Sequence, residues 1–221
     1  MKKIIILMLC VASVYSTKAQ LGQVGLHFGG GYNIPKNDFP DPTKDYKFSY
    51  SYQTGIHSLF YLGEGAMVVT PKLDFSRISF KEDSISLTNT QFDNTIIRSN
   101  LNYINFKLPI GFDIGHMTKR THASIAVGPY FGYLLSGKRK ISNEKRPEDD
   151  QTFPLRIGNS PLDDYKKTDM GWTLEAIFTF GPVYTGFAMD AGLKNISPQK
   201  DVLIKNRNYY FFLGFSFLKQ R

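Results

Sequence analysis

The amino-acid sequence predicts an all-β protein, a single eight-stranded antiparallel up-and-down transmembrane β-barrel. Two observations carry this prediction. Apolar and polar side chains alternate along several segments, and the connections between these segments are alternately long and short. Side chains alternate between the two faces of a β-strand, and a tilted strand of about 9–11 residues is long enough to cross a bilayer. No long apolar run follows the first twenty residues, so a membrane protein built from spanning helices is excluded.

The clearest pair of strands lies at 101–138, where a polar turn at 115–120 joins two long alternating segments. The apolar face of the first segment carries Ile104, Phe106, Leu108, Ile110 and Phe112. That of the second carries Ile125, Val127, Pro129, Phe131, Tyr133 and Leu135. The opposite face holds small, polar or charged residues over ten positions or more, which favours a transmembrane β-hairpin.

The N-terminal segment is typical of a signal peptide. Two lysines precede an apolar core at 4–14, and a small-residue cleavage site follows at 17–19. We therefore expect a signal peptide at 1–19 and the outer-membrane β-barrel domain at 20–221. The only cysteine, Cys10, lies inside the signal, so the mature chain has no thiol for a disulfide.

The charge balance argues against nucleic-acid binding. Removal of the signal takes away three lysines and no acid, so the formal net charge falls from +8 to +5. This excess is modest and spread along the chain. The roughly 200 remaining residues suffice for one β domain.

Eight strands are expected after the signal, at 22–32, 48–62, 66–80, 101–114, 121–138, 167–180, 183–193 and 207–218. The connections at 33–47, 81–100, 139–166 and 194–206 are long, and those at 63–65, 115–120 and 181–182 are short. Outer-membrane barrels have long extracellular loops and short periplasmic turns, so we expect the N-terminus to be periplasmic. Proline is poorly tolerated within a central strand, so Pro71 predicts an irregularity in the third strand.

The interior of an eight-stranded barrel is just wide enough to be filled by side chains. The residues expected to point inward are His27, Lys72, Asp74, Lys107, Asp113, Glu175, Tyr184 and Asp190. We interpret them as a buried polar plug, whose charges must be paired. A narrow ion path is the alternative, but bulky Tyr130 and Tyr184 oppose a continuous file of water.

His122 and Ser124 are the strongest catalytic candidates, because residues two apart on a strand share a face, as a base and its nucleophile must. The pair looks like the H-x-S pair of eight-stranded lipid A deacylases. It lies beside a short turn, on the side opposite to the outer leaflet, and no carboxylate is evidently placed to orient the histidine. We favour a chance pairing, and the four histidines show no metal-ligand spacing. We therefore expect no catalytic, cofactor-binding or metal residues and no cofactor.

The longest loop begins with basic residues that could grip lipopolysaccharide phosphates or an acidic partner. They are Lys138, Arg139, Lys140, Lys145 and Arg146. Five acidic residues nearby balance them, which favours an ordinary solvated loop. Trp172 and the tyrosines near strand ends are typical of an interfacial aromatic girdle.

Three segments resemble the PorT-like outer-membrane β-barrel family. They are VGPYFGYLLSGK at 127–138, the preceding strand from Tyr103 to Gly111 with its Leu-Pro pair, and GLKNI at 192–196. The resemblance implies an eight-stranded outer-membrane barrel, and the family's namesake is similar to a component needed for type IX secretion. The C-terminus departs from the pattern, because Lys219, Gln220 and Arg221 follow the last aromatic strand.

Taken together, we expect a non-enzymatic barrel in the outer membrane of a Gram-negative cell, with a structural or secretion-accessory role. Its long loops, above all 138–166, would contact membrane lipid, lipopolysaccharide and other envelope or secretion-system proteins, and it would not bind nucleic acid. Two alternatives stay open: a lipid A-modifying enzyme that uses His122 and Ser124, and a small passive pore.

Overall fold

The computed structural model describes residues 19–38, 46–63, 66–83, 95–115, 120–143 and 150–219. The strands are β1 (Ala19–Asn33), β2 (Lys36–Asp38), β3 (Tyr46–Lys47), β4 (Ser49–Leu62), β5 (Met67–Val69), β6 (Lys72–Asp83), β7 (Thr95–Lys107), β8 (Ile110–Ile114), β9 (Thr121–Asn143), β10 (Gln151–Pro154), β11 (Thr168–Phe180), β12 (Val183–Gly192), β13 (Leu203–Lys205) and β14 (Arg207–Lys219). No helix long and apolar enough to cross a membrane occurs in these ranges.

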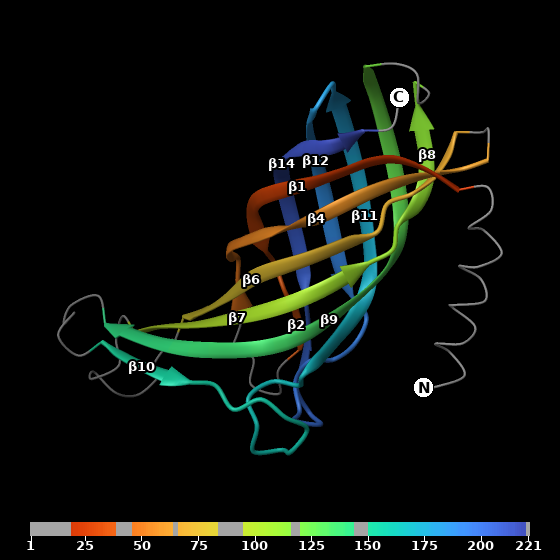
Figure 1. Cartoon of the computed structure of the whole chain (residues 1–221). Coiled ribbons are helices and arrows are strands. Elements are labelled where there is room, and N and C mark those ends of the chain that lie inside the picture. Colours follow the sequence, from red (N-terminus) through yellow and green to blue (C-terminus); the bar gives the residue numbers. More distant parts are fainter. Residues whose placement is uncertain are drawn as a thin grey trace.

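The long strands close into one antiparallel ring, visible in Figure 1 as curved ribbons around a common axis. Two of the eight barrel strands are interrupted. One consists of β5 and β6, and the other consists of β7 and β8. The ring runs from β1 to β4, β5/β6, β7/β8, β9, β11, β12 and β14, and β14 pairs with β1 again. The predicted eight-stranded up-and-down barrel is confirmed.

The two divided strands break next to one another. The expected irregularity at Pro71 is confirmed, because β5 ends at Val69 and β6 begins at Lys72. A second break, at Leu108 and Pro109, was not expected. Backbone hydrogen bonds still cross the breaks, since Thr70 N donates to the Pro109 carbonyl and Leu108 N donates to the Pro129 carbonyl. The sheet therefore stays closed although proline supplies no N–H to the ladder.

The outer surface is an apolar belt. Large hydrophobic side chains that alternate with buried interior ones stay exposed on every barrel strand, among them Leu26, Phe28, Ile56, Leu73, Phe106, Phe112, Ile125, Val127, Leu174, Phe178, Phe187, Leu213 and Phe215. Soluble monomers rarely expose so large a continuous apolar surface, whereas the lipid-facing side of a membrane barrel requires one.

The strand ends joined by the long connections lie at one end of the barrel and those joined by the short turns lie at the other, as expected. At the long-loop end, however, several strands are longer than predicted. β6 continues to Asp83, β7 begins at Thr95 and β9 continues to Asn143, where β10 pairs with it. Together they form an arm that reaches beyond the other strands on the left of Figure 1. Much of the sequence interpreted as loop is therefore ordered sheet.

Two further short strands add to the long-loop end. β2 and β13 pair with each other outside the barrel sheet, and they come from the first and last long connections. The predicted signal peptide lies outside the described residues, apart from Ala19 at the start of β1.

Candidate functional site

The barrel interior holds a group of buried charged side chains. All eight residues predicted to point inward are buried, which confirms their assignment from strand alternation. Further buried polar residues, which had not been singled out as interior, include Gln23, Gln53, His57, Thr70 and Asn105. The interior is therefore a packed polar core.

Lys107 lies at the centre of this core. Its ammonium Nζ is 2.7 Å from Asp190 Oδ2, 3.3 Å from Asp74 Oδ2 and 3.3 Å from Gln53 Oε1. On the far side of the Asp74 carboxylate, His27 Nε2 lies 3.1 Å from Oδ1. A buried cation of this kind persists only because carboxylates on two other strands surround it.

A second buried pair forms between Lys72 and Glu175. Lys72 Nζ is 2.5 Å from Glu175 Oε2, and the Thr70 hydroxyl donates to Oε1 at 2.5 Å. The same ammonium lies 4.4 Å from the centre of the Phe212 ring, within the range of a cation–π contact. The expectation that the interior charges are paired is thus met for both interior lysines.

Aromatic rings fill the space beside these ion pairs. Tyr184 and Phe212 are completely buried and pack with Ile177 and Ala188. The Tyr184 ring lies against Gly214, where any side chain would overlap it. The rings enclose the charged groups, so side chains fill the interior.

At the short-turn end, the structure corrects one expectation about the catalytic candidates. A carboxylate does meet His122, because Asp113 Oδ1 lies 3.0 Å from its Nδ1. Tyr61 donates a hydrogen bond to the other oxygen of Asp113. His122 and Ser124 both point into the barrel, and Ser124 is only 3% exposed. A base with an orienting carboxylate is therefore present, but its serine neighbour is shielded from lipid.

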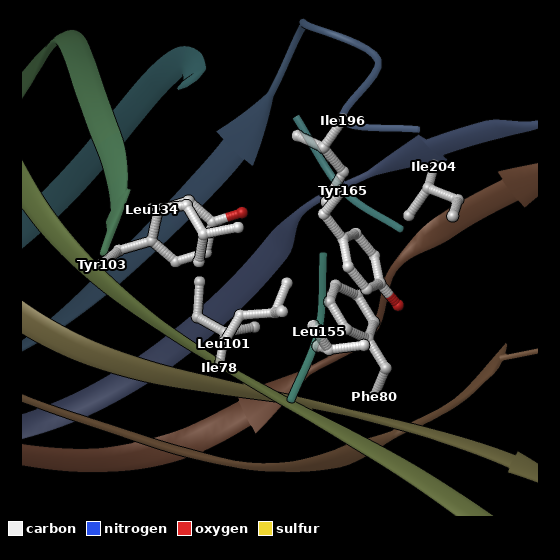
Figure 2. Close-up of a cluster of buried hydrophobic side chains, with 9 residues drawn as sticks. All are labelled: Ile78, Phe80, Leu101, Tyr103, Leu134, Leu155, Tyr165, Ile196 and Ile204. Atoms are coloured by element: carbon white, nitrogen blue, oxygen red, sulfur yellow. The ribbon is translucent and has the colours of Figure 1, made fainter. Parts of the chain in front are cut away.

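The long-loop end is covered by a cap, which we define as residues 155–165 together with 195–204. Figure 2 shows its side chains from the two loop segments pointing toward those of the barrel wall. The cluster comprises Ile78, Phe80, Leu101, Tyr103, Leu134, Leu155, Tyr165, Ile196 and Ile204. Tyr165 stacks on Phe80 with ring centres 5.9 Å apart and planes 10° apart. The cap thus seals the barrel mouth with an apolar layer.

Hydrogen bonds tie the cap to the barrel. Leu155 N donates to the Gly137 carbonyl of β9, and Lys166 N donates to the Ile196 carbonyl, which joins the two loop segments to each other. Directly beneath the apolar layer, Asp169 accepts hydrogen bonds from Tyr130 Oη at 2.9 Å and from Asn206 Nδ2 at 2.7 Å. Sequence reasoning missed the cap, because its proline- and charge-rich segment is typical of a solvated loop.

The basic residues at the start of the longest loop do not form one group. Arg139 turns inward, where its guanidinium lies 3.1 Å from Asp164 and 3.5 Å from the Ser99 hydroxyl. Lys138 and Lys140 point outward, and Lys140 lies 2.6 Å from Asp150. The expected balance by nearby acids is therefore found at two positions. Lys145 and Arg146 lie outside the described residues.

Within the described ranges, no group of three or more histidine, cysteine, aspartate or glutamate side chains is arranged to hold a metal ion.

Comparison with known proteins gives a family but little finer detail. No curated protein matches the chain. Among solved structures, the chain is similar to Ail, the attachment invasion locus protein of Yersinia pestis, which has also been solved with the heparin analogue sucrose octasulfate. The identity is 12%, the match covers 90% of this chain and 100% of Ail, and the TM-score is 0.43. For Neisserial surface protein A the identity is 7%, the coverages are 87% and 97%, and the TM-score is 0.39.

The family model of the outer membrane protein beta-barrel domain matches residues 17–197, which is most of the chain. This match agrees with the closed eight-stranded ring and its apolar outer belt. The chain therefore belongs to the outer membrane protein beta-barrel domain family and is located in the outer membrane.

Proposed function

We propose that the protein is a non-enzymatic, PorT-like outer-membrane barrel that serves as a structural or secretion-accessory component and makes its contacts at the long-loop end. The observation that carries this proposal is the contrast between the barrel's interior and its rim. The interior is filled by paired charges and rings and closed by the cap, whereas the rim is extended into the ordered arm of β6, β7, β9 and β10. The rim thus offers a surface for partners, whereas the filled interior offers no passage through the barrel.

The proposed topology places the long loops outside the cell and the short turns in the periplasm. It includes removal of a signal peptide, so that the mature chain begins at Gln20. Mass spectrometry of the protein purified from outer membranes tests the cleavage, and a mature mass that retains residues 1–19 would contradict it. Protease added to intact cells tests the orientation, because only the long-loop end should be cut.

The partners proposed are other envelope or secretion-system proteins, together with membrane lipid and lipopolysaccharide; nucleic acid is not among them. The resemblance of 127–138 to the PorT-like motif supports the secretion role. Phe153 on β10 is exposed on the arm, opposite Arg139 of β9, and Phe178 is similarly exposed on the apolar belt. Photo-crosslinking residues at these two positions should capture an envelope protein from Phe153 and lipid alone from Phe178. Absence of a protein adduct at Phe153 and at the other exposed rim positions would count against the proposal.

The lipid A-modifying enzyme remains the second candidate, because Asp113 now supplies the carboxylate that orients His122. Burial of Ser124 inside the barrel argues against it, since an ester must reach the serine oxygen. The Ser124→Ala variant should leave the acylation pattern of lipid A unchanged in mass spectra. The choice would be reversed if lipid A differed by one acyl chain between cells with and without the wild-type protein, and if the Ser124→Ala variant abolished this difference.

A further inference from the structure

Four basic residues stand side by side on the outward face of the arm. Strand register sets Lys47 opposite Lys81, Lys81 opposite Arg98, and Arg98 opposite Lys140. Residues directly opposite in antiparallel strands share a face and lie about 5 Å apart. The four positions therefore form one continuous row across β3, β6, β7 and β9.

Two more basic residues lie on the same face, nearer the barrel body. Lys138 is opposite Asn100, two residues before the row on β9, and Arg77 is opposite Asn102, four residues before the row on β6. The face is outward, because Lys47, Arg98, Lys138 and Lys140 are exposed on it, whereas the alternate positions Phe80 and Ser99 are buried. We define the basic patch as Lys47, Arg77, Lys81, Arg98, Lys138 and Lys140.

Like charges placed directly opposite one another in a sheet are destabilising, so this row has an unfavourable arrangement in isolation. Asp150 lies 2.6 Å from Lys140 and offsets one charge of the row. Lys47 and Lys81 make contacts of their own as well. A further ion pair, between Arg139 and Asp164, belongs to the inner face and does not meet the patch.

The patch begins where the apolar belt ends. The last fully apolar row of these strands contains Phe75, Ile104 and Tyr133, and Arg77 is the next outward residue on β6. At about 3.3 Å per residue and a tilt of about 35–45°, the patch spans roughly 5 to 15 Å above the belt. Anionic headgroups of a bilayer and the sugars next to them lie at this height.

The rest of the rim has a different character. On β14, β1 and β4 the outward positions at the upper edge of the belt are Tyr209, Tyr32 and Tyr50, which are opposite one another in register. These rings suit the neutral part of the interface. Positive charge at the edge of the belt is thus lower on these three strands, although Arg207 follows Tyr209 on the outward face of β14.

We propose that the basic patch binds the phosphate groups of lipopolysaccharide in the outer leaflet. The proposal rests on the outward orientation of the long loops given above. Arg98 and Arg77 offer guanidinium forks that match phosphate oxygens, and the lysines add point charges on either side. Bound phosphates would also offset the repulsion within the row, so the ligand and the patch would stabilise one another.

The test compares three purified proteins in detergent: the wild type, the double variant Arg98→Gln with Lys138→Gln, and Arg120→Gln. Arg98 and Lys138 are exposed members of the patch, and Arg120 is an exposed basic residue at the short-turn end. Each protein must first show the heat-dependent shift in gel mobility of a folded barrel. Binding is then measured with fluorescent lipopolysaccharide. The double variant should bind roughly tenfold more weakly or worse, and Arg120→Gln should bind like the wild type.

Three further probes identify the bound chemistry. Dephosphorylated lipopolysaccharide should bind the wild type as weakly as intact lipopolysaccharide binds the double variant. Phosphatidylglycerol and inorganic phosphate should compete poorly, because each offers a single phosphate to a patch that spans four strands. Equal binding by the double variant, or by the dephosphorylated lipid, would overturn the proposal, and so would equal competition by phosphatidylglycerol. Cleavage of the short turns in intact cells would instead refute the proposed orientation, whatever the binding measured in detergent.

Discussion

Gly214 is a residue on which the packing of the interior depends directly. A methyl group at this position would overlap the ring of Tyr184, and one at Gly25 would lie 2.9 Å from the same ring. Tyr184 itself is completely buried between Phe212 and His57, so it has nowhere to move. Close packing of this kind leaves no tolerance for an added carbon.

We therefore predict that Gly214→Ala lowers the stability of the barrel by roughly 1–3 kcal/mol, the usual cost of overpacking. Gly30→Ala is the matched control, because a methyl group at Gly30 meets nothing within 4 Å. The measurement is the urea midpoint of unfolding in lipid vesicles, followed by the fluorescence of the single tryptophan, Trp172. Similar midpoints for both variants would show that the ring can move aside.

The ion pairs of Lys107 give a second prediction at this scale. Lys107→Met leaves Asp74 and Asp190 buried without their shared cation, so it should cost roughly 3–5 kcal/mol. Lys167→Met, at an exposed position before β11, should leave the urea midpoint unchanged. A wild-type midpoint for Lys107→Met would mean that the carboxylates find other partners or water.

Which face each residue takes was predictable from sequence, because strand alternation alone decides it. His27, Lys107 and Asp190 were all assigned inward on that ground and are buried. Which residues meet was not predictable, because contacts such as that of Asp113 with His122 depend on the register between strands. A six-residue turn between them leaves this register open. The orienting carboxylate was missed for this reason.

At the scale of elements, the cap is the part of the fold that sequence reasoning did not find. Its first segment follows Pro154 and contains Pro161 and a mixture of charges, a composition typical of a loop. Its few buried residues, such as Leu155 and Tyr165, have no periodicity that marks them, because each fills a separate space above the barrel wall. The arm was shortened in the prediction for a related reason. Polar residues take both faces of β7 at 98–100 and of β9 at 138–140, which ends the alternation of apolar and polar residues.

The cap should open when its central ring is removed. Tyr165→Ala deletes the ring stacked on Phe80, and loss of a buried aromatic side chain costs roughly 3–5 kcal/mol. Because only the cap rests on this contact, we expect faster trypsin cleavage at exposed Arg156 while the heat-dependent mobility shift of the barrel is kept. Leu162→Ala is the control in the same loop, since Leu162 is 73% exposed. Equal cleavage of both variants would show that the backbone hydrogen bonds hold the cap without Tyr165.

At the scale of the whole molecule, the sequence predicted barrel closure because the evidence for it is distributed along the chain. Eight alternating segments and seven connections of alternating length agree with one arrangement, so a local error such as the missed break at Pro109 does not change the topology. The contacts between the interior side chains could be identified only from the structure. Only the register shows that Lys107, drawn from β7, meets carboxylates from β6 and β12.

Because side chains fill the interior, we do not expect the barrel to conduct ions. An ion that crosses the barrel would have to pass the apolar cap, the charge cluster around Lys107 and the rings of Tyr184 and Phe212. We therefore predict that the wild-type protein in planar lipid bilayers gives no channel currents. Tyr165→Ala should be silent as well, because opening the cap leaves the two lower layers in place. Stepwise currents from a preparation that shows the heat-dependent mobility shift would contradict this prediction and revive the passive pore. Currents from Tyr165→Ala alone would mean that the apolar cap is the only barrier and that the charged interior already conducts.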